Sequence, residues 1–293
     1  MTKTVEALVR ELESLLTVEE MGGDRFLGHR LDDDEGRIYG GEIIAQALAS
    51  AMRTVSEPER VVHSLHAYFI RPGNVTIPTR YHVDRDQDGR SFSARRVTAS
   101  QHGDVILNMS CSFQRMEEGL NHTTPMPSVP DPDTLLNITQ LGHKYLDKIA
   151  PEFRHNYTRA RAVEIRPMSE AQWLLEEPHE PAQRCWFKIA APVGDDPQLH
   201  RALLAWLSDM QLLGTCVLPH GLSWQRNEIT SASLDHAVWF HDEARVDEWI
   251  LFDASSPWSN RGRGLNFGRF YARDGRLIAS MAQEGMIRRR RTS

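Results

Sequence analysis

An internal repeat constrains the fold of this chain more than any other feature of its sequence. The segment SLHAYF (64–69) precedes GRSFSARRVTASQHGDVILNMSCSFQR (89–115), and SLDHAVWF (233–240) precedes GRGLNFGRFYARDGRLIASMAQEGMIR (262–288). Each copy runs from an aromatic-ended strand through a Gly-Arg pair, an alternating strand and a polar turn with glycine to a last strand. This self-similarity predicts a duplicated unit.

Turns and helices can be assigned within each copy. The segments SQHGDV (100–105) and ARDGRL (272–277) predict hairpins, because glycine supplies the positive φ that tight connections need. An apolar helix is expected upstream of each set of strands, over 40–55 in the first copy and over 201–215 in the second. Each half is therefore expected to be an α+β unit in which an antiparallel sheet wraps one long helix.

The 293 residues divide into three parts on this basis. We expect residues 1–116 to form the first unit and residues 161–293, which carry Asp209, the second. Residues 117–160 include the proline-rich TTPMPSVPDPD, which indicates a linker without regular structure.

The second helix carries one carboxylate, Asp209, on a segment that is apolar on nearly every face. A helix of that kind is buried, and an isolated buried carboxylate is costly unless it is paired, hydrogen-bonded or protonated. The apolar side chains around it are Leu203, Leu204, Trp206, Leu207, Met210, Leu212 and Leu213. The rest of the chain is therefore expected to supply Asp209 with partners.

Composition excludes several classes of function. The formal net charge is −6, which disfavours binding to nucleic acid. The three scattered cysteines form no CxxC pair and no histidines have HxxxH spacing, so we expect no metal. No phosphate-binding glycine loop is present, and we expect no cofactor. The charged N-terminal segment and the lack of an apolar run near ~20 residues predict a cytoplasmic protein without membrane contact.

The chain resembles the acyl-CoA thioesterase II family, the TesB type, whose fold is a tandem or double hotdog. Any one matching motif is weak, but the motifs follow one another in order over roughly residues 10 to 290. They are YGGEIIAQALASA (39–51), VHSLHAYFIRPGN (62–74), GRSFSARRV (89–97), LSDMQLLGT (207–215), SLDHAVWFH (233–241), DEWILFDASSP (247–257), GRGLNFGRFYARDGRLIAS (262–280) and AQEGMIR (282–288).

The resemblance implies a catalytic trio that holds a water molecule against a thioester carbonyl. It maps onto Asp209, Ser233 and Gln283, with serine where the family often has threonine. We expect burial to raise the pKa of Asp209, and hydrogen bonds from Ser233 and Gln283 to oppose that rise. A carboxylate poised nearer the working pH is a better general base.

Substrate-binding residues are expected in two places. The start of the first helix, with Gly40, Gly41 and Glu42, offers free backbone N–H groups for an oxyanion, or glycines that only permit close packing. Glu42 lies near the repeat position of Asp209, but Cys111 stands at the repeat position of Gln283, so a second catalytic site is not expected. Coenzyme A phosphates could meet arginines, among them Arg261, Arg263, Arg71, Arg95 and Arg96.

Hydrolysis of fatty acyl-CoA to fatty acid and coenzyme A is the function that these residues favour. The enzyme alternative is a hotdog hydratase or dehydratase of enoyl thioesters, which usually pairs Asp with His around the active helix. We expect Asp235 and His236 to be structural, because neighbouring strand residues point to opposite faces. The non-enzyme alternative is an acyl-CoA-binding protein without turnover. The family resemblance also implies a homo-oligomer, a dimer or a tetramer.

Overall fold

The first copy of the repeat is built on one buried helix. The computed structural model describes residues 3–30, 36–174, 177–224 and 226–290. The first copy and the segment before it contain α1 (Val5–Leu15), β1 (Val18–Glu20), β2 (Arg25–Gly28), α2 (Gly40–Met52), β3 (Arg60–Phe69), β4 (Arg80–Asp88), β5 (Phe92–Gln101) and β6 (Asp104–Arg115).

The second copy has the same order of a helix followed by strands. Its elements are β7 (Val163–Pro167), α5 (Glu170–Leu174), β8 (Ala182–Ile189), α6 (Pro197–Ser208), the 3₁₀ segment η4 (Leu212–His220), β9 (Ile229–Ser233), β10 (Asp235–Phe240), β11 (Ile250–Asn260), β12 (Arg263–Ala272) and β13 (Leu277–Arg289). Short helices join the copies: η1 (Pro132–Thr134), α3 (Ile138–Lys144), η2 (Leu146–Lys148), η3 (Pro151–Phe153) and α4 (Arg154–Thr158).

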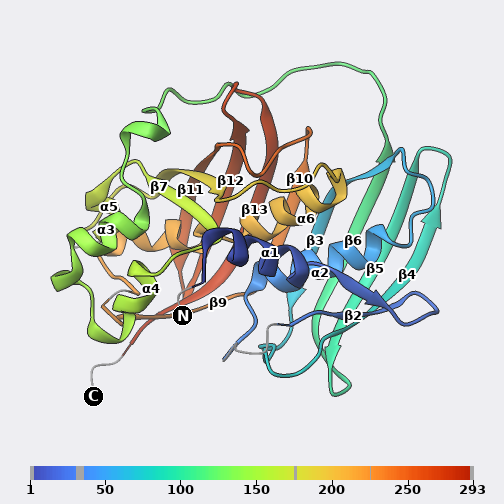
Figure 1. Ribbon diagram of the computed structural model, residues 1–293, viewed down its shortest axis with the longest axis horizontal. Coiled ribbons are helices and arrows are strands. Elements are labelled where there is room, and N and C mark those ends of the chain that lie inside the picture. The colour runs from blue at the N-terminus through green and yellow to red at the C-terminus, as the bar shows by residue number, and fades with distance from the viewer. Residues whose placement is uncertain (1–2, 31–35, 175–176, 225, 291–293) are drawn as a thin grey trace.

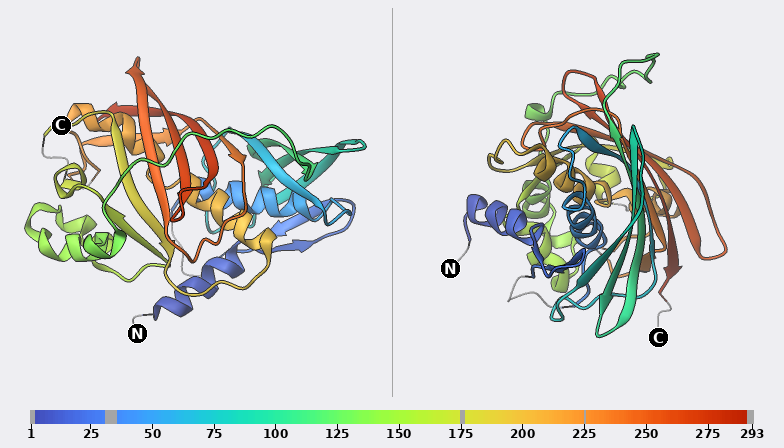
Figure 2. Two further views of the ribbon diagram at one scale, coloured as in Figure 1. Left: turned by 90° about the horizontal axis from the view of Figure 1, so that it is seen from above. Right: turned by 90° about the vertical axis from the view of Figure 1, so that its right-hand side faces the viewer.

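Both copies contribute to one antiparallel sheet. The described strands follow the order β1-β2-β4-β5-β6-β3-β10-β13-β12-β11-β8-β7, and β9 pairs with β13. The repeated strands β3 and β10 meet at the centre, where Ala67 lies opposite His236. Helices α2 and α6 lie side by side against one face of the sheet, which curves around them (Figures 1 and 2). The expected duplication, with a sheet wrapping a helix in each half, is confirmed.

The core lies between the two helices and the inner face of the sheet. Leu48 on α2 and Leu203 and Leu207 on α6 are fully buried. The expected hairpins are also confirmed, since Gly103 joins β5 to β6 with φ 89° and Gly275 joins β12 to β13 with φ 94°. These positive φ angles are ones that glycine adopts without strain.

The helix expected over 201–215 differs from the observed one. Helix α6 begins at Pro197, after the N-cap Asp196, and ends at Ser208, so that Asp209 is its C-cap residue. Gln211 then has a left-handed backbone with φ 63°, and a 3₁₀ segment follows. The prediction of one continuous helix was wrong because apolar periodicity does not reveal where a backbone leaves the α conformation. The break places Asp209 at a helix end.

The linker expectation is right for only part of 117–160. Residues 117–131 contain no regular element, but short helices occupy much of Pro132–Thr158. Part of the irregular stretch packs on the outer face of the second copy, where Pro130 O accepts a hydrogen bond from Trp186 at 3.0 Å. Proline marked the irregular part correctly, but η1 and η3 each begin at a proline, Pro132 and Pro151, since proline is tolerated at the first position of a helix.

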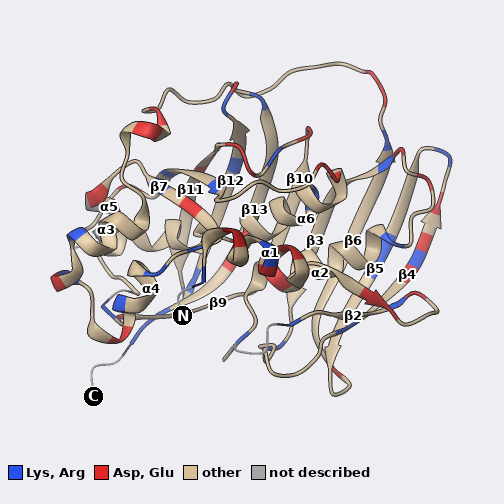
Figure 3. Cartoon of the chain, in the orientation of Figure 1, with Lys and Arg blue, Asp and Glu red and all other residues tan. Residues whose placement is uncertain are grey.

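Within the part of the chain that the structure describes, one stretch, which comprises α6 and η4, has the length and composition of a membrane span. Pro197–His220 has a mean hydropathy of 1.3 in its most apolar window, but 61% of that window is buried inside the protein. This pattern is that of the core helix of a folded domain. Acidic and basic positions are interspersed along the strands, helices and loops (Figure 3).

Candidate active site

Asp209 lies at the junction between the two repeat copies. Its side chain is 6% exposed, and its position at the C-cap of α6 places it at the negative end of that helix dipole. The N-terminus of α2 faces it from the other copy and supplies a hydrogen bond from the backbone N–H of Gly41. The positive end of one helix thus partly offsets the unfavourable end of the other.

The three residues expected to form a trio do converge. Gln283 Nε2 donates to Asp209 Oδ1 at 2.5 Å and to Ser233 Oγ at 3.1 Å. The expected direct hydrogen bond between Ser233 and Asp209 is not found; the Gln283 amide joins them instead. Gln283 is fully buried on β13, and Ser233 ends β9, which pairs with β13. A site shared by these side chains therefore depends on strand pairing between distant segments.

Leu234 and Asp235, at the junction of β9 and β10, bind the backbone of β13 beside Gln283. Asp235 Oδ1 accepts a hydrogen bond at 2.7 Å from the backbone N–H of Glu284, the residue after Gln283. Leu234 N donates to Glu284 O at 2.9 Å. Asp235 is therefore structural, as expected, because its carboxylate holds the backbone beside Gln283.

The electrostatics of Asp209 agree with the expectation of a raised pKa. Burial raises the pKa of Asp209 to about 7, and the hydrogen bonds from Gln283 and the Gly41 backbone oppose this rise. Ser233 was expected among these donors, but the second donor to Asp209 is the Gly41 backbone N–H. A carboxyl group with a pKa near neutrality can both accept and release a proton at physiological pH.

The two glycines at the start of α2 are required by close packing. A Cβ on Gly40 would lie 2.6 Å from Asp209 Oδ2. A Cβ on Gly41 would clash with the carbonyl oxygen of Trp206 and would lie 2.6 Å from the Tyr39 ring. Tyr39 also donates from its hydroxyl to Trp206 O at 3.2 Å. The glycines thus let the two helix ends meet at the carboxylate.

We expect Gly41→Ala to lower the free energy of unfolding by about 1–3 kcal/mol, the usual cost of overpacking. Helix propensity alone predicts the opposite sign, since alanine favours a helix over glycine. Chemical denaturation measures the change. Gly194→Ala is the control, because a Cβ there meets nothing within 4 Å. A Gly41→Ala protein as stable as Gly194→Ala would contradict the close contact.

A histidine that the sequence analysis assigned only a structural role lies beside Asp209. His236 Nδ1 is 4.0 Å from Asp209 Oδ1, and the His236 side chain has no exposed surface. Burial lowers the pKa of His236 to about 3, so the ring is neutral. The alternation of neighbouring strand residues correctly separated His236 from Asp235, but it could not show that His236 points toward α6.

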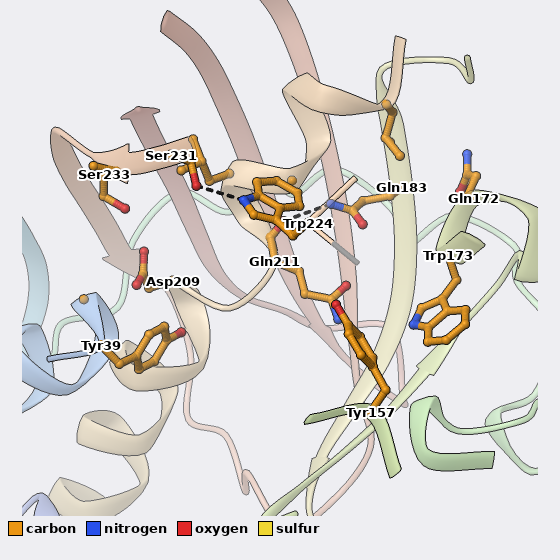
Figure 4. Close-up of a pocket in the computed structure, with 15 residues that line it drawn as sticks. Tyr39, Tyr157, Gln172, Trp173, Gln183, Asp209, Gln211, Trp224, Ser231 and Ser233 are labelled. Atoms are coloured by element: carbon orange, nitrogen blue, oxygen red, sulfur yellow. Dashed lines mark hydrogen bonds between the residues drawn. The ribbon is translucent and has the colours of Figure 1, made fainter. Parts of the chain in front are cut away.

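Two cavities share lining residues, and Asp209 borders the first of them. The first, of about 420 Å³, has Asp209, Ser233 and Tyr39 at one end and Trp173 and Tyr157 at the other (Figure 4). The second, of about 310 Å³, is mostly apolar and carries two arginines. It is lined by Arg37, Ile38, Gly40, Ile43, Phe69, Ile70, Arg71, Pro72, Gly73, Ile106, Ser231, Ala232, Ser233 and Leu234. Gly40 and Ser233 border both cavities, Asp209 borders the first, and the buried Gln283 side chain borders neither.

The cavity walls include residues that sequence reasoning missed. Trp173, Trp224 and Tyr157 come from segments with no repeat partner and no periodic pattern. Tyr157 belongs to α4, in the part of the chain that was expected to be an irregular linker. The only available signal was their aromatic character, which core residues share.

The expected arginines are distributed over different surfaces. Arg71 lines the second cavity. Arg95 is buried and bound to Thr54 and Asp88, and Arg96 pairs with Asp84 and Asp86.

Two of the expected substrate contacts lie away from the cavities. Arg263 pairs with Glu284 at 3.2 Å and covers the Trp258 ring, and it lines neither cavity. Arg261 occupies the β11–β12 turn with φ 52° and also lines neither. Their expected contact with coenzyme A therefore has no support at either cavity.

Glu42 is buried on α2, at 9% exposure, and borders neither of these two cavities. Cys111, at the repeat position of Gln283, is a buried thiol whose pKa burial raises to about 12. Its sulfur donates to the backbone oxygen of Arg95 at 3.7 Å. The first copy thus offers no amide in place of Gln283. Among the described residues, no cluster of His, Cys, Asp and Glu could hold a metal ion.

Comparison with known proteins identifies the two halves. Residues 155–286 match the family model described as acyl-CoA thioesterase, and residues 31–114 match the model of the acyl-CoA thioesterase N-terminal domain. Mouse acyl-coenzyme A thioesterase 8 is 39% identical over 94% of this chain and 88% of its own length.

Solved structures agree with the architecture. An acyl-CoA thioesterase II, TesB2, from Mycobacterium marinum has a TM-score of 0.78 and 36% identity, covering 97% of this chain and 99% of its own. A protein from Alicyclobacillus acidocaldarius described as having a hot dog fold has a TM-score of 0.76 at 20% identity, covering 95% and 98%. The double hotdog is therefore the fold of this protein, and the chain belongs to the acyl-CoA thioesterase family.

Proposed function

We propose that this protein hydrolyses fatty acyl-CoA to a free fatty acid and coenzyme A, with Asp209 as the general base. The observation that carries the proposal is the convergence of Asp209, Ser233 and Gln283 at a point where Asp209 borders one cavity and Ser233 borders two. A carboxylate with a pKa of about 7 is suited to take a proton from water near neutral pH.

The chemical step needs an oriented water molecule and a stabilised oxyanion. Asp209 accepts a proton from the water as its oxygen bonds to the thioester carbonyl carbon. Ser233 holds that water by a hydrogen bond, and the Gln283 amide, which donates to both Asp209 and Ser233, holds those two side chains in place. The N-terminus of α2, where Gly40 borders both cavities, stabilises the oxyanion. When the C–S bond breaks, the Asp209 proton passes to the thiolate, giving coenzyme A and the fatty acid.

The two cavities suggest how the substrate lies. The second cavity carries Arg37 and Arg71, whose charge complements the phosphates of coenzyme A. The first cavity is bordered by Trp173, Trp224 and Tyr157 without a cation among its lining residues, and it suits the acyl group. This assignment replaces Arg261 and Arg263 as the proposed coenzyme A contacts.

The hydratase alternative needs a histidine that reaches the substrate. His236 is the histidine beside Asp209, but it is fully enclosed and borders neither cavity. Hydrolysis therefore has the better support. Hydration of an enoyl-CoA without thiol release would favour the alternative, and tight binding without turnover would favour a binding protein.

Release of free thiol from acyl-CoAs of graded chain length tests the proposal. The three cysteines are buried, so a thiol-reactive dye reports coenzyme A with little background. We expect Gln283→Ala to lower kcat/KM by about 10- to 150-fold, because a hydrogen bond to a charged group contributes ~1.5–3 kcal/mol.

Ser280→Ala is the matched control for Gln283→Ala. Ser280 lies on the same strand, but its hydroxyl contacts the exposed His241 at 2.9 Å. We expect its activity to equal that of the wild type. Equal activities of Gln283→Ala and Ser280→Ala would contradict the role of the amide.

A homo-oligomer and a cytoplasmic location remain proposals from the family resemblance and the sequence. The outer face of the sheet exposes large apolar side chains, including Tyr68 at 63% and Phe267 at 46%. Exposed apolar surface of this kind supports contact with a second copy.

A further inference from the structure

His236 is a buried polar side chain that the proposed chemical step does not use. It lies on β10, has no exposed side-chain surface and borders neither cavity. Its Nδ1 atom has no hydrogen-bond partner among the described residues, although it lies 4.0 Å from Asp209 Oδ1. A buried polar atom without a partner is costly, so its persistence beside the base calls for an explanation.

The hydrogen bonds of Ser208 determine which ring nitrogen carries the proton. Ser208 Oγ lies 2.7 Å from the carbonyl oxygen of Ala205, which can only accept, so the serine hydroxyl donates there. A hydroxyl has one proton, and Ser208 Oγ must therefore accept at 2.8 Å from His236 Nε2–H. In a neutral ring this leaves Nδ1 without a proton and with its lone pair available.

That lone pair distinguishes the two protonation states of Asp209. Beside an ionised carboxylate, an unprotonated nitrogen places two acceptors against each other. Beside a protonated carboxyl group, the same nitrogen can accept a hydrogen bond. A movement of about 1 Å would bring the 4.0 Å separation to hydrogen-bond length.

We propose that His236 is a positioning residue whose Nδ1 accepts a hydrogen bond from the Asp209 carboxyl group after that group takes the proton from water. This inference rests on the proposed function and extends it. The proton moves from water to Asp209 and later to the departing sulfur, while His236 stays neutral throughout. His236 thus holds the protonated base in place during the lifetime of the tetrahedral intermediate.

Other titratable groups do not replace this role. Among the described residues, Tyr39, the N-cap residue of α2, and His236 from β10 face the Asp209 carboxyl group. Burial and the Asp209 charge raise the pKa of Tyr39 well above its usual value, so the phenol stays protonated across the range of the assay. Gln283, from β13, does not titrate.

Steady-state kinetics of His236→Leu and His236→Asn test the proposal. Leucine fills the space without an acceptor, whereas the asparagine oxygen can accept from the carboxyl group close to the position of Nδ1. We expect His236→Leu to lower kcat for acyl-CoA hydrolysis about 2- to 12-fold with KM unchanged, on the scale of a lost hydrogen bond between two neutral groups. We expect His236→Asn to recover a part of that loss.

The pH profile of kcat/KM for Ser208→Ala is an independent test, because a merely structural role of His236 would leave that profile unchanged. Without the serine acceptor, the ring is free to carry its proton on Nδ1 and donate to ionised Asp209. We expect the acidic limb of the pH profile of kcat/KM to shift to lower pH. His241→Leu, a histidine change on the surface, should leave both kcat and the limb unchanged.

Two results would overturn the inference. One is a His236→Leu enzyme with wild-type kcat. The other is a Ser208→Ala enzyme in which the acidic limb of the pH profile of kcat/KM lies at the same pH as in the wild type. Either result could occur in an enzyme that hydrolyses acyl-CoA normally, so the proposed function would stand. A wild-type protein that releases no thiol would instead remove the proposed function.

Discussion

Asp209→Asn is expected to lower kcat/KM for acyl-CoA hydrolysis by ~10²-fold or more, the range that general-base catalysis contributes. Asparagine keeps the size of the side chain and can still bond to Gln283, but it cannot accept a proton from water. The loss should therefore fall on kcat rather than on substrate binding. Thiol release under saturating acyl-CoA measures it.

The pH dependence of the wild type identifies the same group. Asp209 must be ionised to act as a base, so kcat/KM should rise with pH and level off above an apparent pKa of about 7. This limb should disappear in the residual activity of Asp209→Asn.

Asp253→Asn is the matched control for Asp209→Asn. Asp253 pairs with Arg184 at 2.6 Å and with Arg269, and it borders neither cavity. We expect this enzyme to keep wild-type activity. An Asp209→Asn enzyme that turns over as fast as Asp253→Asn would remove the mechanism.

The repeat made much of the fold predictable from the sequence. Hairpin glycines and alternating strands are local signals, and Gly103 and Gly275 adopt the positive φ that those signals imply. The end of α6 was not predictable, because apolar residues continue from Leu207 past Leu212 although the backbone changes at Gln211. Local pattern thus identifies an element more reliably than its boundary.

The site was predictable where one residue posed an energetic problem. A carboxylate among leucines required partners, and the family resemblance identified Gln283 and Ser233 as those partners. The resemblance did not reveal that the Gln283 amide joins the other two. His236 was missed because its position near Asp209 depends on the pairing of β10 with β3 and on the approach of α6, which are long-range features.

The cavity walls were the least predictable part of the site. Tyr157 and Trp173 come from the segment that joins the two copies and its continuation, where no internal repeat guides the interpretation. The sequence could not show that Arg71 lines a cavity and Arg263 does not. The difference arises because the Arg263 side chain reaches Glu284 and Trp258, whereas Arg71 lines the second cavity.

Removing the Asp209 carboxylate should also stabilise the protein in alkaline solution. The pKa of Asp209 is about 7 in the folded protein, against an ordinary value of 3.8. Ionised Asp209 therefore opposes folding, by about 4 kcal/mol from ~1.36 kcal/mol per pH unit of pKa difference. This cost is absent below pH 3.8 and develops fully as the pH rises through 7.

We expect Asp209→Asn to unfold several degrees above the wild type at pH 8 and at nearly the same temperature at pH 4. Asp247→Asn should show the opposite sign, because a hydrogen bond and charge from Arg245 and a bond from Val193 N lower the pKa of Asp247 despite its partial burial. Its loss should destabilise the protein at pH 8, and the difference should shrink as the pH falls. Equal unfolding temperatures of Asp209→Asn and wild type at pH 8 would show that the buried carboxylate costs no stability. In that case the raised pKa, on which its action as a base near neutral pH depends, would lack support.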